Sequence, residues 1–229
     1  NNMCISKIKN NLTWIHGKNK NDILITIFVI SISDKQLKYC IESINKLDLN
    51  HSVLINVIQN IYPTNKAYNI MRERCTTDYF IQLDEDMELY QNAINIIYKT
   101  MKKSRYLNIY RLRDDYLGLE DDSYIYGLKV YNQNIMKKYP TMNNGTTITS
   151  AVDRCWHKQI SKDGYKKRTH TIIVGNHERN RTNFDIFLKY SKVTNNLLTK
   201  YINKVTKCDD DLARLLIPVY KGSININEF

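Results

Sequence analysis

The sequence predicts an α/β domain with a mixed, mostly parallel β-sheet flanked by helices. Three short runs rich in β-branched residues alternate with segments of helical period between residues 23 and 83. Such alternation is typical of α/β domains. The first run, residues 23–30, is almost continuously apolar, which indicates a strand covered on both faces, as in a parallel sheet.

The first half of the chain supplies three predicted strands, at residues 23–30, 52–58 and 79–83. Between the first two, Asp34 can act as an N-cap for a helix whose apolar side chains recur at helical spacing. Those side chains are Leu37, Cys40, Ile41, Ile44 and Leu47. A second, shorter helix is expected over residues 65–75.

The second half continues the pattern, and Gly164 is a suitable C-cap for its second helix. We expect a helix over residues 92–103, followed by strands at 107–112 and 123–131. A polar loop at 141–149, a helix at about 153–163 and a strand at 169–174 come next. Three regions follow from these elements. Residues 1–22 are expected to be an N-terminal extension, 23–181 the main domain, and 182–229 a helical C-terminal extension packed on the same domain.

The chain is basic: 34 Lys and Arg against 23 Asp and Glu give a net charge of +11. That balance is compatible with nucleic acid, an anionic membrane surface or phosphorylated substrates. The basic residues are spread along the chain rather than concentrated on one helix or patch. We therefore interpret most of the charge as a solvated face and expect no nucleic-acid partner.

The five cysteines are widely spaced and contain no CxxC pair, which argues against a disulfide framework or a zinc site and favours a reducing compartment. No apolar run approaches the roughly 18 residues of a membrane span, and the N-terminus has no signal-peptide pattern. The expected location is the cytoplasm, that of the host cell if the chain is of viral origin. Peripheral membrane contact stays open.

An acidic triplet, Asp84-Glu85-Asp86, directly follows the third predicted strand. Ligands of α/β sheets collect at the carboxyl ends of the strands. Two aspartates in the pattern D-x-D can reach one divalent cation, and their hard oxygen ligands suit Mg²⁺ or Mn²⁺. The sequence therefore predicts a metal site at this edge of the sheet.

Segments that follow one another in the family's order along the chain resemble the family 2 glycosyltransferases and their GT-A relatives. The stretch 79–87 resembles the family's strand that runs into the D-x-D loop, and 65–69 (NKAYN) its preceding helix start. The first strand and helix resemble its opening region. Val152 and Asp153 stand where it carries the start of a catalytic helix, and 174–178 (VGNHE) resembles its closing segment. The resemblance covers residues 23–180 and implies a GT-A fold, with 23–181 as the catalytic domain.

The resemblance implies that Asp84 and Asp86 hold Mn²⁺ or Mg²⁺ and that His177 is a third ligand, with His170 in reserve. The metal would neutralise charge on a departing nucleoside diphosphate. Asp153 would be the general base of an inverting transfer, and it can also be a plain helix N-cap. The implied reaction moves a hexose or related sugar from a nucleotide sugar to a hydroxyl of a glycan, a protein-linked glycan or a lipid-linked acceptor.

Other residues could bind the donor or acceptor. Asp84 would bind the donor through the metal. Guanidinium and ammonium groups suit a diphosphate directly, and the candidates are Lys66, Arg72, Arg179 and Arg181. His157 could orient Asp153 from the same helix face. Three aromatic residues could stack on a sugar or belong to the core: Trp156, Tyr124 and Tyr126.

The sequence departs from the family pattern at two places. Gln59 and Asn60 occupy the region where many relatives carry an aspartate that reads uracil, and Val152 replaces a glutamate. Two alternatives stay open. One is a sugar nucleotidyltransferase, which would need a Gly-rich loop where residues 31–34 contain no glycine. The other is a non-catalytic domain that binds nucleic acid or a partner, which would not need Asp86.

Overall fold

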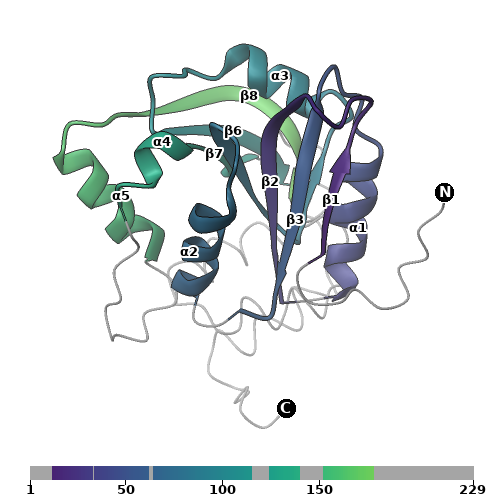
Figure 1. Ribbon diagram of the computed structural model, residues 1–229, viewed down its shortest axis with the longest axis horizontal. Helices are drawn as coiled ribbons and strands as arrows, with labels where there is room; N and C mark the ends of the chain where they lie inside the picture. The colour runs from purple at the N-terminus through teal and green to yellow at the C-terminus, as the bar shows by residue number, and fades with distance from the viewer. Residues whose placement is uncertain (1–11, 33, 62–63, 115–123, 140–151, 178–229) are drawn as a thin grey trace, which may run out of the picture. The chain divides into compact units, whose positions relative to one another are not determined.

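The computed structural model describes residues 12–32, 34–61, 64–114, 124–139 and 152–177 (Figure 1). The chain divides into two compact units. Residues 1–113 and 124–177 form the first, and 114–123 with 178–229 form the second. Apart from Asp114, the second unit lies outside the described residues, as do the predicted loop 141–149 and the predicted C-terminal helical extension.

The described residues form an eight-stranded mixed sheet of order β1-β3-β2-β4-β7-β6-β8-β5. The strands are β1 (Thr13–His16), β2 (Ile23–Ser31), β3 (Ser52–Gln59), β4 (Tyr79–Asp84), β5 (Met87–Leu89), β6 (Leu107–Asp114), β7 (Tyr124–Asn132) and β8 (Lys167–His177). Strands β3, β2 and β4 pair parallel, whereas β1 with β3, β4 with β7, β6 with β7 and β5 with β8 pair antiparallel. The mixed sheet is confirmed, with β3-β2-β4 as a parallel part.

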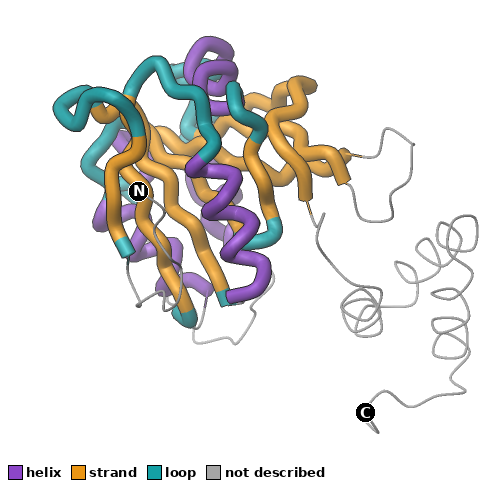
Figure 2. Tube along the Cα trace, turned by 90° about the vertical axis from the view of Figure 1, so that its right-hand side faces the viewer, coloured by secondary structure: helices purple, strands orange, loops and turns teal. Residues whose placement is uncertain are grey.

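Five helices are described, on both faces of the sheet (Figures 1 and 2). They are α1 (Asp34–Asn45), α2 (Thr64–Arg74), α3 (Ala93–Thr100), α4 (Gln133–Met136) and α5 (Val152–Lys162). Residues of α1 and α3 pack in one hydrophobic cluster, and residues of α2, α4 and α5 in the other. Two layers of helices therefore enclose the sheet, as the sequence predicts.

Strand β2 separates these clusters because successive side chains of a strand point to opposite faces. Ile25, Ile27 and Val29 belong to the α1–α3 cluster, whereas Phe28 belongs to the other. All four side chains are buried. The second cluster is aromatic, with Phe80 stacked on Tyr131 at a ring separation of 5.0 Å. Because β2 is buried on both faces, its carboxyl end is held in place by packing. Asp84, the first residue of the acidic triplet, pairs with Ile30 at that end.

The predicted N-terminal extension is partly wrong. Thr13–His16 form β1, which pairs antiparallel with β3 and places Trp14 opposite Ile55. The Thr13 hydroxyl also donates to the Asn56 side chain at 2.8 Å. Residues 13–16 therefore complete the edge of the sheet and belong to the main domain.

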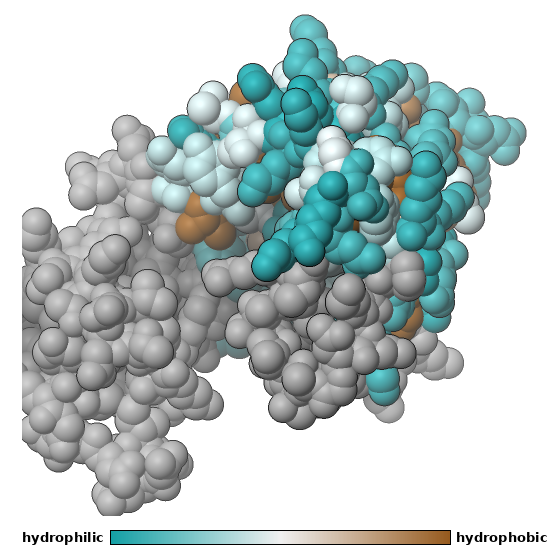
Figure 3. All heavy atoms as spheres, turned by 90° about the vertical axis from the view of Figure 1, so that its left-hand side faces the viewer, coloured by the Kyte–Doolittle hydropathy of each residue, from teal (hydrophilic) through white to brown (hydrophobic). Residues whose placement is uncertain are grey.

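The surface view in Figure 3, from the left-hand side of Figure 1, is mostly hydrophilic over the described residues, with hydrophobic ones scattered. Scattered apolar residues are normal for a protein surface. None of the described helices has the length and apolar character needed to span a membrane.

Candidate active site

The candidate site lies where the three parallel strands end. Register places Asp84 of β4 beside Ile30 of β2, and Gln59 of β3 beside Ser31 of β2. The preceding side chain, Leu83, is fully buried. The chain therefore passes from the core directly into its carboxylates, at the edge where ligands of α/β sheets bind.

Asp84 is half-buried at the end of β4. Burial raises the pKa of its carboxyl above the ordinary value, and the nearby negative charge of Asp86 raises the pKa further. A hydrogen bond from Gln82 Nε2 to Asp84 Oδ1, at 3.2 Å, and the charges of Lys129 and His177 act in the opposite direction. A buried carboxylate with an acidic neighbour favours the binding of a cation.

Glu85 joins the acidic triplet to the end of β2. Its Oε2 accepts a hydrogen bond from the Ile32 backbone amide at 3.1 Å, and its own amide donates to the Ile30 carbonyl at 3.1 Å. Burial raises the pKa of the Glu85 carboxyl to about 7, although the bond from Ile32 opposes this shift. Glu85 therefore ties the acidic triplet to the end of β2 and to Ile32, the residue that follows it.

Asp86 and His177 meet in space although 90 residues separate them in sequence. His177 Nε2 lies 3.7 Å from Asp86 Oδ2, and each side chain is only 15% exposed. The contact follows from the pairing of β5 with β8, which sets Met87 opposite His177. Gly175 permits this pairing, because a Cβ at that position would clash with the carbonyl oxygen of Glu88.

The predicted metal ligands are therefore brought to one corner, with a qualification. Among the described residues, no three His, Cys, Asp or Glu side chains are arranged closely enough to hold a metal ion as they stand. Asp86 and His177 form a ready pair, and the charges of both act on the pKa of Asp84. Carboxylate oxygens and an imidazole nitrogen are donors that suit Mn²⁺. The donor chemistry of these residues fits a divalent cation.

Lys66 and Arg72, both on α2, have different surroundings. Lys66 is exposed in the first turn of the helix, at the end that follows β3. The Arg72 guanidinium donates to the Lys137 carbonyl and to Glu73. Lys137 follows α4, and Asn132 just before α4 pairs with Tyr79 at the beginning of β4. The structure thus places Arg72 near the beginning of β4, whereas Asp84 is at its carboxyl end.

His170 and Trp156 are part of the core. The His170 ring stacks on Tyr110 at 4.3 Å and shares a 2.9 Å hydrogen bond with Asn108, and burial lowers the pKa of its imidazole. Seven residues of strand, about 23 Å, separate it from His177. Trp156 is 3% exposed and donates its indole N–H to the Tyr139 carbonyl.

His157, Tyr124 and Tyr126 also have described surroundings. The His157 ring packs between Tyr106 and Tyr131, at 5.8 and 6.0 Å. Tyr124 and Tyr126 are 40% and 45% exposed, and the Arg111 guanidinium lies 3.6 Å from the centre of the Tyr124 ring. Of the three aromatic residues considered for stacking at the donor or acceptor, Trp156 is buried, whereas Tyr124 and Tyr126 keep an exposed surface.

Three predicted site residues are not placed. Asp153 lies in the first turn of α5, but its side chain is outside the described residues. Arg179 and Arg181 follow the end of β8 and are also outside them. Their predicted roles stay predictions.

Sequence reasoning missed the cation Lys129, whose charge acts on Asp84. Lys129 on β7 pairs with Gln82 on β4. The alternation of residues 124–130 predicts the strand, but only the pairing register reveals which acidic residue the lysine approaches. The bond between Ile32 and Glu85 was missed for the same reason, since residues of different strand ends are brought together by the register.

No protein-family model matches the sequence, and no similar sequence is found among curated proteins. Solved structures are similar in fold. TarS residues 1–349 from S. aureus superpose with a TM-score of 0.50 at 9% identity, covering 90% of this chain and 77% of that one. The mannosyltransferase PcManGT from Pyrobaculum calidifontis, in complex with GDP-Man and Mn²⁺, gives 0.48 at 12% identity, covering 87% and 73%.

A nucleotidyltransferase is also similar at a lower score. The 4-diphosphocytidyl-2C-methyl-D-erythritol synthase from Anaerococcus prevotii gives a TM-score of 0.41 at 11% identity, covering 72% of this chain and 96% of that one. The chain has the GT-A fold that the family resemblance implies, and its mixed sheet adds β1 and β5 to the six strands predicted from the sequence.

Proposed function

We propose that this GT-A domain is a metal-dependent glycosyltransferase that moves a hexose or related sugar from a nucleoside diphosphate to an acceptor hydroxyl. The observation that carries the proposal is the 3.7 Å approach of Asp86 to His177 at the carboxyl end of the parallel strands. Such a pair is useful to a transferase because a diphosphate leaving group needs its growing negative charge neutralised.

The proposed cation is Mn²⁺ or Mg²⁺, held by Asp86 and His177 with Asp84 as the third ligand. When bound, it would supply Lewis acidity toward the diphosphate. Asp84 is suited to this role because burial and the charge of Asp86 raise the pKa of its carboxyl, so both carboxylates gain from a shared positive neighbour. Glu85 holds the adjoining loop through Ile32.

The protein's own residues would do the remaining work. We propose that Lys66, exposed at the first turn of α2, attracts the donor phosphates, and that Arg179 and Arg181 do the same. Asp153 at the start of α5 would take the proton of the acceptor hydroxyl, which makes the transfer inverting. Gln59, 4% exposed at the end of β3, stands where many family 2 relatives read uracil with an aspartate.

We propose a glycan, a protein-linked glycan or a lipid-linked sugar as the acceptor and the cytoplasm as the location. A peripheral contact with a membrane is compatible with the net charge of +11. A nucleic-acid partner is not proposed, because the basic residues are spread along the sequence.

The test is a panel of nucleotide sugars incubated with the protein and Mn²⁺, with release of nucleoside diphosphate as the readout. We expect at least one donor to be turned over, and Asp86→Asn to lower that rate by about a hundredfold or more, the loss seen when a charge-stabilising group is removed. Asp48→Asn is the matched control, since Asp48 is exposed in the connection between α1 and β3, before the beginning of β3. It should leave the rate unchanged.

Three results would contradict the proposal. They are no turnover of any donor, turnover that is equal in Asp86→Asn and the wild type, or release of pyrophosphate from a nucleoside triphosphate with a sugar phosphate. The last result would identify a sugar nucleotidyltransferase.

A further inference from the structure

A cavity with several polar side chains in its lining lies at the opposite end of the sheet from the acidic triplet. Its volume is about 360 Å³, and its polar lining consists of Asn50, His51, Asn92, Asn95, Tyr98 and Lys99. Leu24, at the beginning of β2, also lines it. Ile30, which pairs with Asp84, stands six residues further along β2, so about 20 Å of strand separates the two sites.

Helix α3 presents one face to this cavity. Asn92, Asn95, Ile96 and Lys99 all line it, and their spacing of three and four residues is that of a single helix face. Asn92 is the N-cap residue, yet its side chain makes no capping hydrogen bond. Its amide is therefore available for a ligand, whereas an ordinary N-cap side chain is engaged with the helix.

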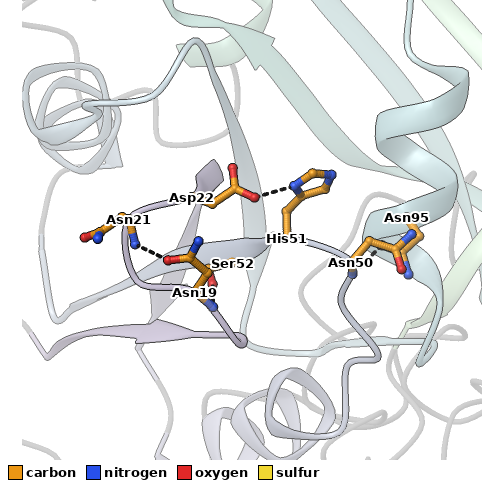
Figure 4. Close-up of polar contacts among 7 residues, drawn as sticks. All are labelled: Asn19, Asn21, Asp22, Asn50, His51, Ser52 and Asn95. Atoms are coloured by element: carbon orange, nitrogen blue, oxygen red, sulfur yellow. Dashed lines mark hydrogen bonds and ion pairs between the residues drawn. The ribbon is translucent and has the colours of Figure 1, made fainter.

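The other wall is held in place by hydrogen bonds (Figure 4). Asn95 Nδ2 donates to the Asp48 carbonyl at 2.8 Å, and Asn95 Oδ1 accepts from the Asn50 amide at 3.2 Å. His51 Nδ1 lies 2.7 Å from Asp22 Oδ2. The carboxylate fixes the ring and leaves Nε2 as the nitrogen that can meet a ligand. A wall fixed in this way loses little conformational freedom on binding.

The lining chemistry indicates what would bind. Carboxamides both donate and accept hydrogen bonds, which matches hydroxyl groups that do the same. Tyr98 adds an aromatic ring 6.1 Å from the His51 ring, so the cavity also has an apolar surface. The lining contains no carboxylate for a metal cation, and Lys99 is its single ammonium group, too few for a polyphosphate.

We propose that this cavity binds a saccharide unit. Its volume is at the lower end of the roughly 300 to 1,000 Å³ of ligand pockets, which suits one or two sugar rings. Asn92 and His51 Nε2 bond the hydroxyls, and Tyr98 contacts the apolar face of the ring. The site is distinct from the proposed donor site and would hold a remote part of a glycan.

Saturation-transfer NMR of the full chain tests this, with the methyl glycosides of glucose, mannose, galactose and N-acetylglucosamine as probes. Metal and nucleotide sugar are left out, so the result does not depend on the proposed transferase activity. We expect at least one glycoside to bind and Asn92→Ala to weaken its affinity about threefold to tenfold, as for the loss of one hydrogen bond. Tyr98→Leu should weaken binding to a similar degree.

Asn21→Ala is the matched control, because Asn21 is an exposed asparagine on the neighbouring turn and does not line the cavity (Figure 4). It should bind like the wild type, and circular dichroism verifies that each variant is folded. Three outcomes overturn the proposal: no glycoside binds, binding is equal in Asn92→Ala and Tyr98→Leu to the wild type, or inorganic phosphate binds and displaces the glycoside.

Discussion

Gly175→Ala should disturb the pairing of β5 with β8 while leaving the rest of the fold in place. A Cβ at this position would overlap the carbonyl oxygen of Glu88 and lie 3.1 Å from Leu112 Cδ2. Because the backbone carbonyl of Glu88 cannot rotate out of the way as the end of a side chain can, β8 must move away from β5. Overpacking of this kind costs about 1 to 3 kcal/mol. For a domain of this size each kcal/mol lowers the midpoint of thermal unfolding by about 2 to 4 °C.

The same shift would move His177, two residues further along β8, away from Asp86. Gly175→Ala is therefore expected to weaken Mn²⁺ binding as well as stability. Gly127→Ala is the matched control, because its Cβ would meet only the side-chain ends of Ile125, Leu112 and Met87, at 3.0 to 3.4 Å. Thermal unfolding with and without Mn²⁺ measures both effects. Equal unfolding midpoints and equal Mn²⁺ shifts for the two variants would refute the reasoning.

Three further predictions concern other residues. The pKa of Glu85 is raised from an ordinary value of 4.5 to about 7, so its stabilising contribution is present below pH 4.5 and lost as pH rises to about 7. Glu85→Gln should flatten that part of the stability–pH profile of the metal-free protein in chemical denaturation, and an unchanged slope would contradict the burial argument. Trp156→Phe removes the 2.8 Å bond to Tyr139 and should lower the unfolding free energy by about 1 to 3 kcal/mol while kcat/KM is retained. A loss of kcat/KM without loss of stability would indicate that Trp156 contacts the sugar rather than supporting the core. Lys66→Ala should raise KM for the donor about tenfold, because one charge-assisted contact is lost, whereas Arg72→Ala should lower stability and leave KM unchanged. Steady-state kinetics in which Arg72→Ala raises KM and Lys66→Ala does not would assign phosphate binding to Arg72 instead.

Much of the fold follows from sequence pattern because its central strands are buried on both faces. Residues 23–30 were predicted as a strand, and β2 spans Ile23–Ser31. The helix expected over residues 65–75 is α2, Thr64–Arg74. Long apolar runs and helical periods are local properties, so the chain alone reveals them. The position of the acidic triplet after β4 follows in the same way.

Features that depend on pairing could not be read locally. Strand β1 is four residues of mixed polarity, and it exists because β3 offers an open edge. The contact of Arg72 with the Lys137 carbonyl depends on where α4 lies, which no local sequence pattern reveals. Trp156 and His170 could each belong to core or site by sequence, and only packing against Tyr139 and Tyr110 places them in the core.

The pairing of Asp86 with His177 was predicted only through family resemblance. No spacing rule connects two residues with 90 others between them, and the structure brings them together through the β5–β8 register. The 3.7 Å approach is independent of the resemblance, since it follows from strand pairing and from the close passage that Gly175 allows.

A titration of the isotope-labelled protein with Mn²⁺, followed by the NMR signals of its histidine rings, tests the cation site most directly. Paramagnetic broadening should reach the His177 ring at the lowest Mn²⁺ concentrations, leave the ring of His51 sharp, and disappear from His177 in Asp86→Asn. Broadening that begins at His51, or that stays at His177 when Asp86 is replaced, would contradict a cation held between the acidic triplet and β8.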